Sequence, residues 1–256
     1  MNDTIEPRRR VIEILGLDRE PEKPVYGPND AVSLENVTPY PPDLDDLARL
    51  YDLVRRRRVT TILEFGSGYS TAVMAAALEE NRLDFADAPA FLALRRNNPF
   101  ELHSVDGSAA WLETTATRIP DWCRDRASMH RSDVSIGLFA DRLVHYYNDL
   151  PNVCPDFIYL DGPMQHDVAG EVGGLHFRHN DRTVVAADIA RMEWLLLPGT
   201  YVLVDGRTNN ARFLRANLQR DWNYSHEPEA DVHSFELVEP PLGALNQRQL
   251  AFCLGP

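Results

Sequence analysis

From Thr60 onward, short apolar runs alternate with stretches of helical periodicity, and this alternation restricts the fold more than any other feature of the chain. Short apolar runs bounded by polar residues are typical of buried strands, whereas apolar residues repeated every ~3.6 positions indicate helices. Such an alternation predicts a parallel sheet with helices on both faces. The expected strands are 61–65, 102–105, 127–130, 157–160 and 201–204, and the expected helices are 70–80, 108–118 and 188–197.

The end of the chain departs from this alternation. A helix is expected over 209–222, and the apolar segments 233–238 and 249–254 then follow with no helix between them. The most economical arrangement makes these two segments an antiparallel pair at one edge of the parallel sheet. The predicted fold class is therefore α/β, a Rossmann-like three-layer sandwich with a seven-stranded mostly parallel sheet, last strand pair antiparallel, plus an N-terminal helical arm.

Residues 1–42 differ in character from the rest. A short helical pattern around Val11 and Ile14 is followed by prolines that recur up to position 42. This composition predicts an arm or lid over the main domain, and not a second domain. The main domain, 43–256, opens with a helix whose first turn is acidic and whose last turn holds the arginines 55–58. That polarity complements the helix dipole, so the arginine run is interpreted as a helix end.

The composition limits the partners that the protein can have. The chain has 39 acidic and 26 basic residues and a formal net charge of −13, which disfavours nucleic-acid phosphates as a substrate. No apolar run approaches the ~20 residues of a membrane helix, and the short apolar stretch near the N-terminus contains Glu13, unlike a signal peptide. The three cysteines are widely spaced, which indicates free thiols in a reducing compartment. We expect a cytoplasmic protein with no membrane partner. The oligomeric state stays open, with a homo-oligomer as one alternative.

The first expected strand leads into Gly66-x-Gly68 and then directly into a helix. Glycines let the backbone turn sharply and let a ligand approach closely, and the helix start offers free N–H groups. The third glycine of the dinucleotide fingerprint would fall at Thr71, which disfavours NAD. Asp106 ends the second expected strand, where one carboxylate can accept both hydroxyls of a ribose. The alternative is that Asp106 only caps the helix after it.

Five segments in this order resemble the class I S-adenosylmethionine-dependent methyltransferases, over roughly residues 58–256. They are 62–68, 104–106, 131–133, 155–162 and 197–205. The chain is closest in style to small-molecule O-methyltransferases, including those that act on sugars and natural products. The resemblance implies S-adenosyl-L-methionine as cofactor and a small-molecule acceptor whose hydroxyl is methylated. It places the Glu64 loop against the methionine moiety, Asp106 on the ribose, and Ser132 with Asp133 beside the adenine. The implied cofactor-binding set is Glu64, Gly66, Ser67, Gly68, Ser70, Asp106, Ser132, Asp133 and Asp161.

Two routes for activating the acceptor stay open. Asp161 and Asp205 each end an apolar strand, so they should face the same crevice. The positions that match them bind Mg²⁺ in catechol-type and related sugar O-methyltransferases, usually with another Asp or Asn directly after the second acid. This chain has Gly206 there, which favours the second route, a general base. His166 follows the fourth expected strand on a loop, and its side chain titrates near neutral pH. Asp161 and His166 are the catalytic candidates, and Asp161 and Asp205 are the metal candidates.

Two further functions compete with methyl transfer. One is an NAD(P)-linked oxidoreductase on the same kind of sheet, which Thr71 and the antiparallel tail disfavour. The other is a catalytically silent nucleotide-binding domain that acts as a partner protein. His145, Tyr146 and Tyr147 are expected on a helical stretch and are left out of the site, because such side chains on a helix face are more often part of the core.

Overall fold

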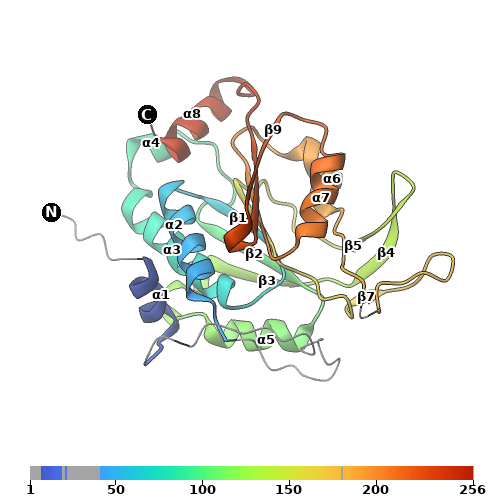
Figure 1. The fold of residues 1–256 in the computed structure, drawn as a ribbon. Helices are drawn as coiled ribbons and strands as arrows, with labels where there is room; N and C mark the ends of the chain where they lie inside the picture. Colours follow the sequence, from blue (N-terminus) through green and yellow to red (C-terminus); the bar gives the residue numbers. More distant parts are fainter. Residues whose placement is uncertain (1–6, 19–20, 22–40, 180, 256) are drawn as a thin grey trace.

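The computed structural model describes residues 7–18, 21, 41–179 and 181–255. Its main sheet consists of β1 (Thr61–Phe65), β2 (Glu101–Asp106), β3 (Ala127–Arg131), β6 (Phe157–Leu160), β8 (Tyr201–Asp205), β9 (Trp222–Glu227) and β10 (Val232–Leu237). The seven strands lie in the order β3-β2-β1-β6-β8-β10-β9, and β10 runs opposite to the other six. This arrangement confirms the predicted fold class (Figure 1).

Helices cover both faces of the sheet because successive strand residues point to opposite sides. Ile62 belongs to one apolar core and Leu63 to the other. The first core lies under α1 (Pro7–Leu15), α2 (Leu44–Arg56) and α3 (Tyr69–Phe85), and the second lies under α6 (Asp188–Met192) and α7 (Thr208–Asn217). A run of small residues, 75–77, is fully buried in α3 and lets that helix pack close to the sheet. The remaining helix of the alternating series, α5 (Ala109–Arg118), contacts α3 and β2.

The C-terminal part differs from the prediction. The helix expected over 209–222 ends at Asn217, and Trp222 already belongs to β9. The strand expected over 249–254 is wrong, because this segment belongs to helix α8 (Gly243–Leu254). Gln249, Phe252 and Cys253 are the buried residues of that segment, and their spacing is helical. The antiparallel pair at the sheet edge is therefore β9 with β10.

A second, three-stranded sheet was not expected. It consists of β4 (Val134–Phe139), β5 (Arg142–Tyr147) and the short β7 (Val168–Ala169), in the order β5-β4-β7. The helical interpretation of His145, Tyr146 and Tyr147 is therefore wrong, since all three lie on β5. Ala140 and Asp141, with φ values of 46° and 60°, form the tight turn that joins β4 to β5. His145 and Tyr147 are buried, as expected of core residues.

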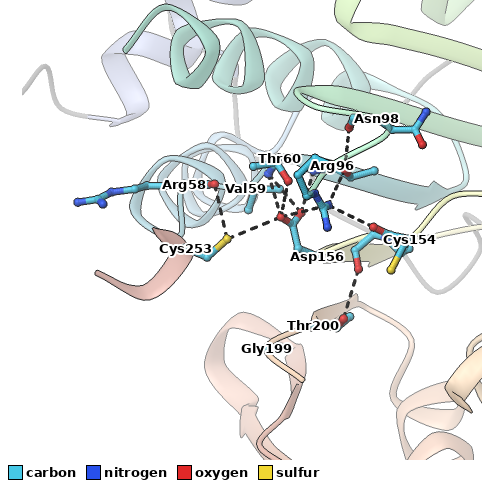
Figure 2. A network of polar contacts seen from close by, with 12 residues as sticks. Arg58, Val59, Thr60, Arg96, Asn98, Cys154, Asp156, Gly199, Thr200 and Cys253 are labelled. Carbon is cyan, nitrogen blue, oxygen red and sulfur yellow. Dashed lines mark hydrogen bonds and ion pairs between the residues drawn. The ribbon is translucent and has the colours of Figure 1, made fainter. Parts of the chain in front are cut away.

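A carboxylate organises the amino ends of the strands. Asp156 is 5% exposed and precedes β6. It accepts hydrogen bonds from the Thr61 backbone N–H at 2.8 Å and from the Thr60 hydroxyl at 2.7 Å. The guanidinium of Arg96 lies 3.5 Å from its carboxylate, as Figure 2 shows. Arg96 comes from the long connection between α3 and β2, residues 86–100, which also holds the short helix α4 (Pro89–Leu92). Part of that connection therefore neutralises a buried charge at the amino edge of the sheet.

The N-terminal helix packs on the main domain. Val11 and Ile14 of α1 are buried in the core that α2 and α3 share. The proline-rich part of the expected arm, residues 22–40, lies outside the described residues, and the boundary at 42 stays a prediction. Among the helices that the structure describes, none is both long and apolar enough to cross a membrane.

Candidate functional site

Two backbone segments touch where β1 and β6 end. Gly66 has a φ of +91°, and a Cβ at this position would lie 2.7 Å from the backbone nitrogen of Gly162. The fold itself therefore requires glycine at position 66. Gly68 differs, because its φ of 173° is extended backbone and the nearest atom to a Cβ there is the Ser70 hydroxyl at 4.0 Å. A Cβ at position 68 would therefore meet no close contact.

Glu64 holds the turn between β1 and α3. Its side chain is fully buried, and its two carboxylate oxygens accept hydrogen bonds from the Ser70 hydroxyl at 2.5 Å and the Thr71 hydroxyl at 2.7 Å. Burial raises the pKa of Glu64 to about 7, although the hydrogen bonds from Ser70 and Thr71 oppose the rise. Glu64 and Ser70 thus fix the glycine loop to the first turn of α3.

Asp106 joins the ends of β2 and β1. One carboxylate oxygen accepts from the Ser67 backbone N–H at 3.0 Å, and the other accepts from the Ser108 N–H at 2.8 Å. Ser108, and not Asp106, is the N-cap of α5, since its hydroxyl accepts from the Trp111 N–H at 3.2 Å. Burial raises the pKa of Asp106, and the two backbone hydrogen bonds oppose the rise. The carboxylate is thus held against the glycine loop, where the lone pairs that remain can accept further hydrogen bonds.

Ser132 and Asp133 follow β3 at the same edge. The Ser132 N–H donates to the Asp106 carbonyl at 3.0 Å, and the buried Ser132 hydroxyl accepts from the Asp149 N–H at 2.9 Å. Asp133 has a side chain that is 66% exposed and pairs with Arg131 at 2.6 Å. The structure therefore brings together the predicted residues of three neighbouring strands, β1, β2 and β3.

The two acids after β6 and β8 have different partners. Asp205 accepts a hydrogen bond from the Tyr159 hydroxyl at 2.9 Å. Burial and the negative charge of Asp161 raise the pKa of Asp205 to about 7. Asp161 lies beside the guanidinium of Arg207, whose Nε is 3.4 Å from the Asp161 carboxylate and whose Nη1 donates to the Pro163 carbonyl at 3.0 Å. Arg207 thus supplies a positive charge at the edge of this crevice.

A Mg²⁺ ion at Asp161 and Asp205 does not fit these contacts. The ion needs several oxygen ligands in octahedral geometry, but Arg207 already neutralises Asp161, and Gly206 offers no side-chain oxygen after Asp205. Arg207 was not predicted as a site residue. The signal in the sequence that could have indicated it is its position directly after a strand end and a glycine.

His166 lies in the turn that precedes β7. It is half-buried, and its Nε2 atom is buried without a hydrogen-bond partner among the residues that the structure describes. The neighbouring Asp167 packs against Gly107, where an added Cβ would lie 3.2 Å from the Asp167 Cβ. The turn with His166 thus contacts the loop that follows Asp106. The Nε2 atom of His166 therefore has a hydrogen-bonding capacity that no described residue uses.

The comparisons with known proteins found structural likeness only. No family model matches the sequence, and no curated protein is significantly similar to it. Among solved structures, the chain is similar to an O-methyltransferase of tomaymycin synthesis from Streptomyces achromogenes in complex with S-adenosylmethionine, at 15% identity, a TM-score of 0.42, and coverage of 78% of this chain and 82% of that one.

Two other solved structures show similar values. An O-methyltransferase from Bacillus cereus in complex with S-adenosylhomocysteine has 14% identity, a TM-score of 0.41, and coverage of 93% of both chains. A methyltransferase from Podospora anserina bound to S-adenosylhomocysteine has 15% identity, a TM-score of 0.43, and coverage of 78% of this chain and 80% of that one.

Proposed function

We propose that this protein is an S-adenosylmethionine-dependent methyltransferase that methylates a hydroxyl group of a small molecule. One observation carries the proposal: the Asp106 carboxylate is fixed against the glycine loop by Ser67, while the space beside Gly68 is open. A carboxylate for a ribose diol thus lies next to an open turn at the carboxyl ends of parallel strands, where open α/β sheets bind ligands.

The chain's own residues suit the parts of that donor. Asp106 would accept from the ribose hydroxyls, and Ser132 with Asp133 would lie beside the adenine. The loop Gly66, Ser67 and Gly68, which Glu64 and Ser70 hold in place, would lie along the methionine moiety, with Asp161 at the mouth of the cleft. When bound, the donor supplies a methyl group on a sulfonium, which is already a good leaving group. The protein therefore has to align the acceptor and to accept its proton.

We assign the proton-accepting role to His166. Its Nε2 atom has no partner among the described residues, so a hydroxyl can donate to it. Asp161 is less suited, because the guanidinium of Arg207 already contacts its carboxylate, although burial raises the pKa of Asp161. His166→Ala should lower turnover by ~100-fold or more, whereas EDTA should leave turnover largely intact. Complete loss of turnover in EDTA with recovery on adding Mg²⁺, together with an active His166→Ala enzyme, would contradict this assignment.

The excess of acidic residues and the free cysteines support two further parts of the proposal, the partner class and the compartment. We place the enzyme in the cytoplasm, where thiols stay reduced, and assign it a small-molecule acceptor with no nucleic-acid partner.

The experiment that tests the function is a calorimetric titration of the purified protein with S-adenosylhomocysteine and, separately, with NAD. We expect micromolar binding of the first, and a ligand at ~100 times its dissociation constant should stabilise the fold by ~2.7 kcal/mol. Clear binding of NAD without binding of S-adenosylhomocysteine would overturn the proposal in favour of an oxidoreductase. Donor binding without turnover on any hydroxyl acceptor would instead favour a silent binding domain.

A further inference from the structure

The hairpin of β9 and β10 presents three metal-ligating side chains together. His226 and His233 are directly opposite each other across the two strands. Their rings stack with centroids 3.9 Å apart and an interplanar angle of 9°. Asp231 lies in the turn between the two strands, and one ligand atom from each of the three residues lies within 4.8 Å of the others.

The chemistry of this trio suits a divalent transition metal. Zn²⁺ binds histidine nitrogen at about 2.0–2.1 Å and carboxylate oxygen at about 2.0–2.2 Å, so its ligand atoms lie roughly 3.3 Å apart. His226 and Asp231 are exposed and His233 is buried, so the two exposed side chains are the ones that would rotate to bring the ligand atoms to this spacing. Two imidazoles and one carboxylate leave a coordination position for water.

The surroundings of His233 also fit metal binding. A ligating histidine commonly donates its second ring N–H to a neighbouring oxygen, which fixes the tautomer. The Nδ1 of His233 lies 2.9 Å from the Tyr224 hydroxyl, which can accept that proton. The Nε2 of His233 lies 3.1 Å from the Thr208 hydroxyl, a contact that a bound metal would replace. The Thr208 hydroxyl donates to the Asp231 carboxylate at 3.1 Å, so it orients the third ligand.

We propose that His226, Asp231 and His233 form a binding site for Zn²⁺ or a similar divalent transition metal. The ion would bind the β9–β10 turn through Asp231, which also accepts a hydrogen bond from Thr208 in the first turn of α7. The site is separate from the proposed donor site, because it lies on the last two strands of the sheet, whereas the donor residues follow β1, β2 and β3. It also shares no residue with Asp161 and Asp205.

The test is a titration with Co²⁺, followed by visible absorption spectroscopy, and with Zn²⁺, followed by calorimetry, on the full chain prepared without a polyhistidine tag. We expect one equivalent to bind, with a raised melting temperature. His226→Ala removes an exposed ligand, and Asp231→Asn keeps a residue that tolerates the left-handed backbone at this position, where φ is 48°. Each variant should weaken metal binding by about tenfold or more while the metal-free melting temperature stays close to that of the wild type.

The matched control is His130→Ala. His130 and His103 form the other stacked histidine pair, with ring centroids 5.2 Å apart, on β3 and β2. This variant should bind Co²⁺ as the wild type does. Binding that His226→Ala leaves unchanged, or that His130→Ala weakens equally, would overturn the proposal, as would the absence of any binding. S-adenosylhomocysteine binding should be the same in His226→Ala and the wild type, so failure of this metal site and failure of the proposed function are distinguishable.

Discussion

The two edges of the main sheet use carboxylates in opposite ways. At the amino edge, Asp156 accepts from two backbone N–H groups and one hydroxyl and lies beside Arg96 (Figure 2). At the carboxyl edge, Asp205 accepts from the Tyr159 hydroxyl, and its pKa is raised to about 7. A carboxylate surrounded by donors stabilises a fold, whereas one with few donors carries a desolvation cost. Asp205 thus has fewer donors than Asp156, a contrast that agrees with the proposal that the carboxyl edge receives a ligand.

The largest effect should come from exchanging one carboxylate at each edge for its amide. Asp156→Asn turns acceptor oxygens into an NH₂ group that faces N–H donors, and it leaves Arg96 without its counter-charge. The free energy of unfolding should fall by about 3–5 kcal/mol. Asp205→Asn keeps an acceptor for the Tyr159 hydroxyl, so at pH 8 the free energy of unfolding should stay the same or rise. Denaturant unfolding of both variants gives the comparison, and equal losses would show that the two edges do not differ.

Within the carboxyl edge, the two glycines of the loop separate a role in stability from a role in ligand binding. Gly66→Ala forces a Cβ to 2.7 Å from the Gly162 nitrogen at a positive φ, which should cost about 3 kcal/mol of stability. Gly68→Ala places its Cβ in open space, so the free protein should melt within a few degrees of the wild type. It should nevertheless lose donor binding, because that space is the proposed ligand position. Thermal unfolding and calorimetry measure the two outcomes. Donor binding that survives Gly68→Ala would rule out the proposed pose.

The pH dependence of stability tests the desolvation of Glu64. Its pKa is raised to about 7 in the folded protein, above the value of ~4.3 for an unperturbed glutamate. The folded state therefore binds more protons than the unfolded state between these values, and the stability present below pH 4 is lost as the pH rises through 7. The contribution is on the order of 3 kcal/mol. Glu64→Gln should remove it, so that the wild type loses more stability than the variant between pH 4.5 and 8. Parallel curves would contradict the raised pKa.

The sequence predicted the parts of this site that depend on local order along the chain. Gly66, Gly68 and Asp106 each follow a strand whose apolar run is evident, so their meeting at one edge follows from parallel pairing. Arg207 was not predicted, because its role depends on the path of the chain after Pro163 in three dimensions. The tight pairing of Gly66 with Gly162 was likewise invisible in the sequence, and the first glycine was interpreted only in terms of a ligand.

Two errors in the fold have a common cause. Segments 142–147 and 249–254 are short and mainly apolar, and periodicity alone does not separate strand from helix at such lengths. The first forms β5 because the turn at Ala140 and Asp141 pairs it with β4. The second forms α8, in which Phe252 packs against Phe85 with ring centroids 5.7 Å apart. The register of β9 with β10 also places His226 directly opposite His233. This register was not predicted from the sequence.

The most direct test of the central claim is the affinity of Asp106→Asn for S-adenosylhomocysteine, measured by calorimetry beside Ser108→Ala. Ser108→Ala removes the cap of α5 and should cost about 1 kcal/mol of stability, while it leaves the carboxylate in place. If the carboxyl edge holds a donor ribose through Asp106, Asp106→Asn should bind at least about tenfold more weakly than the wild type, a loss of ~1.4 kcal/mol. Ser108→Ala should bind as the wild type does. Equal affinity in all three proteins would contradict the account.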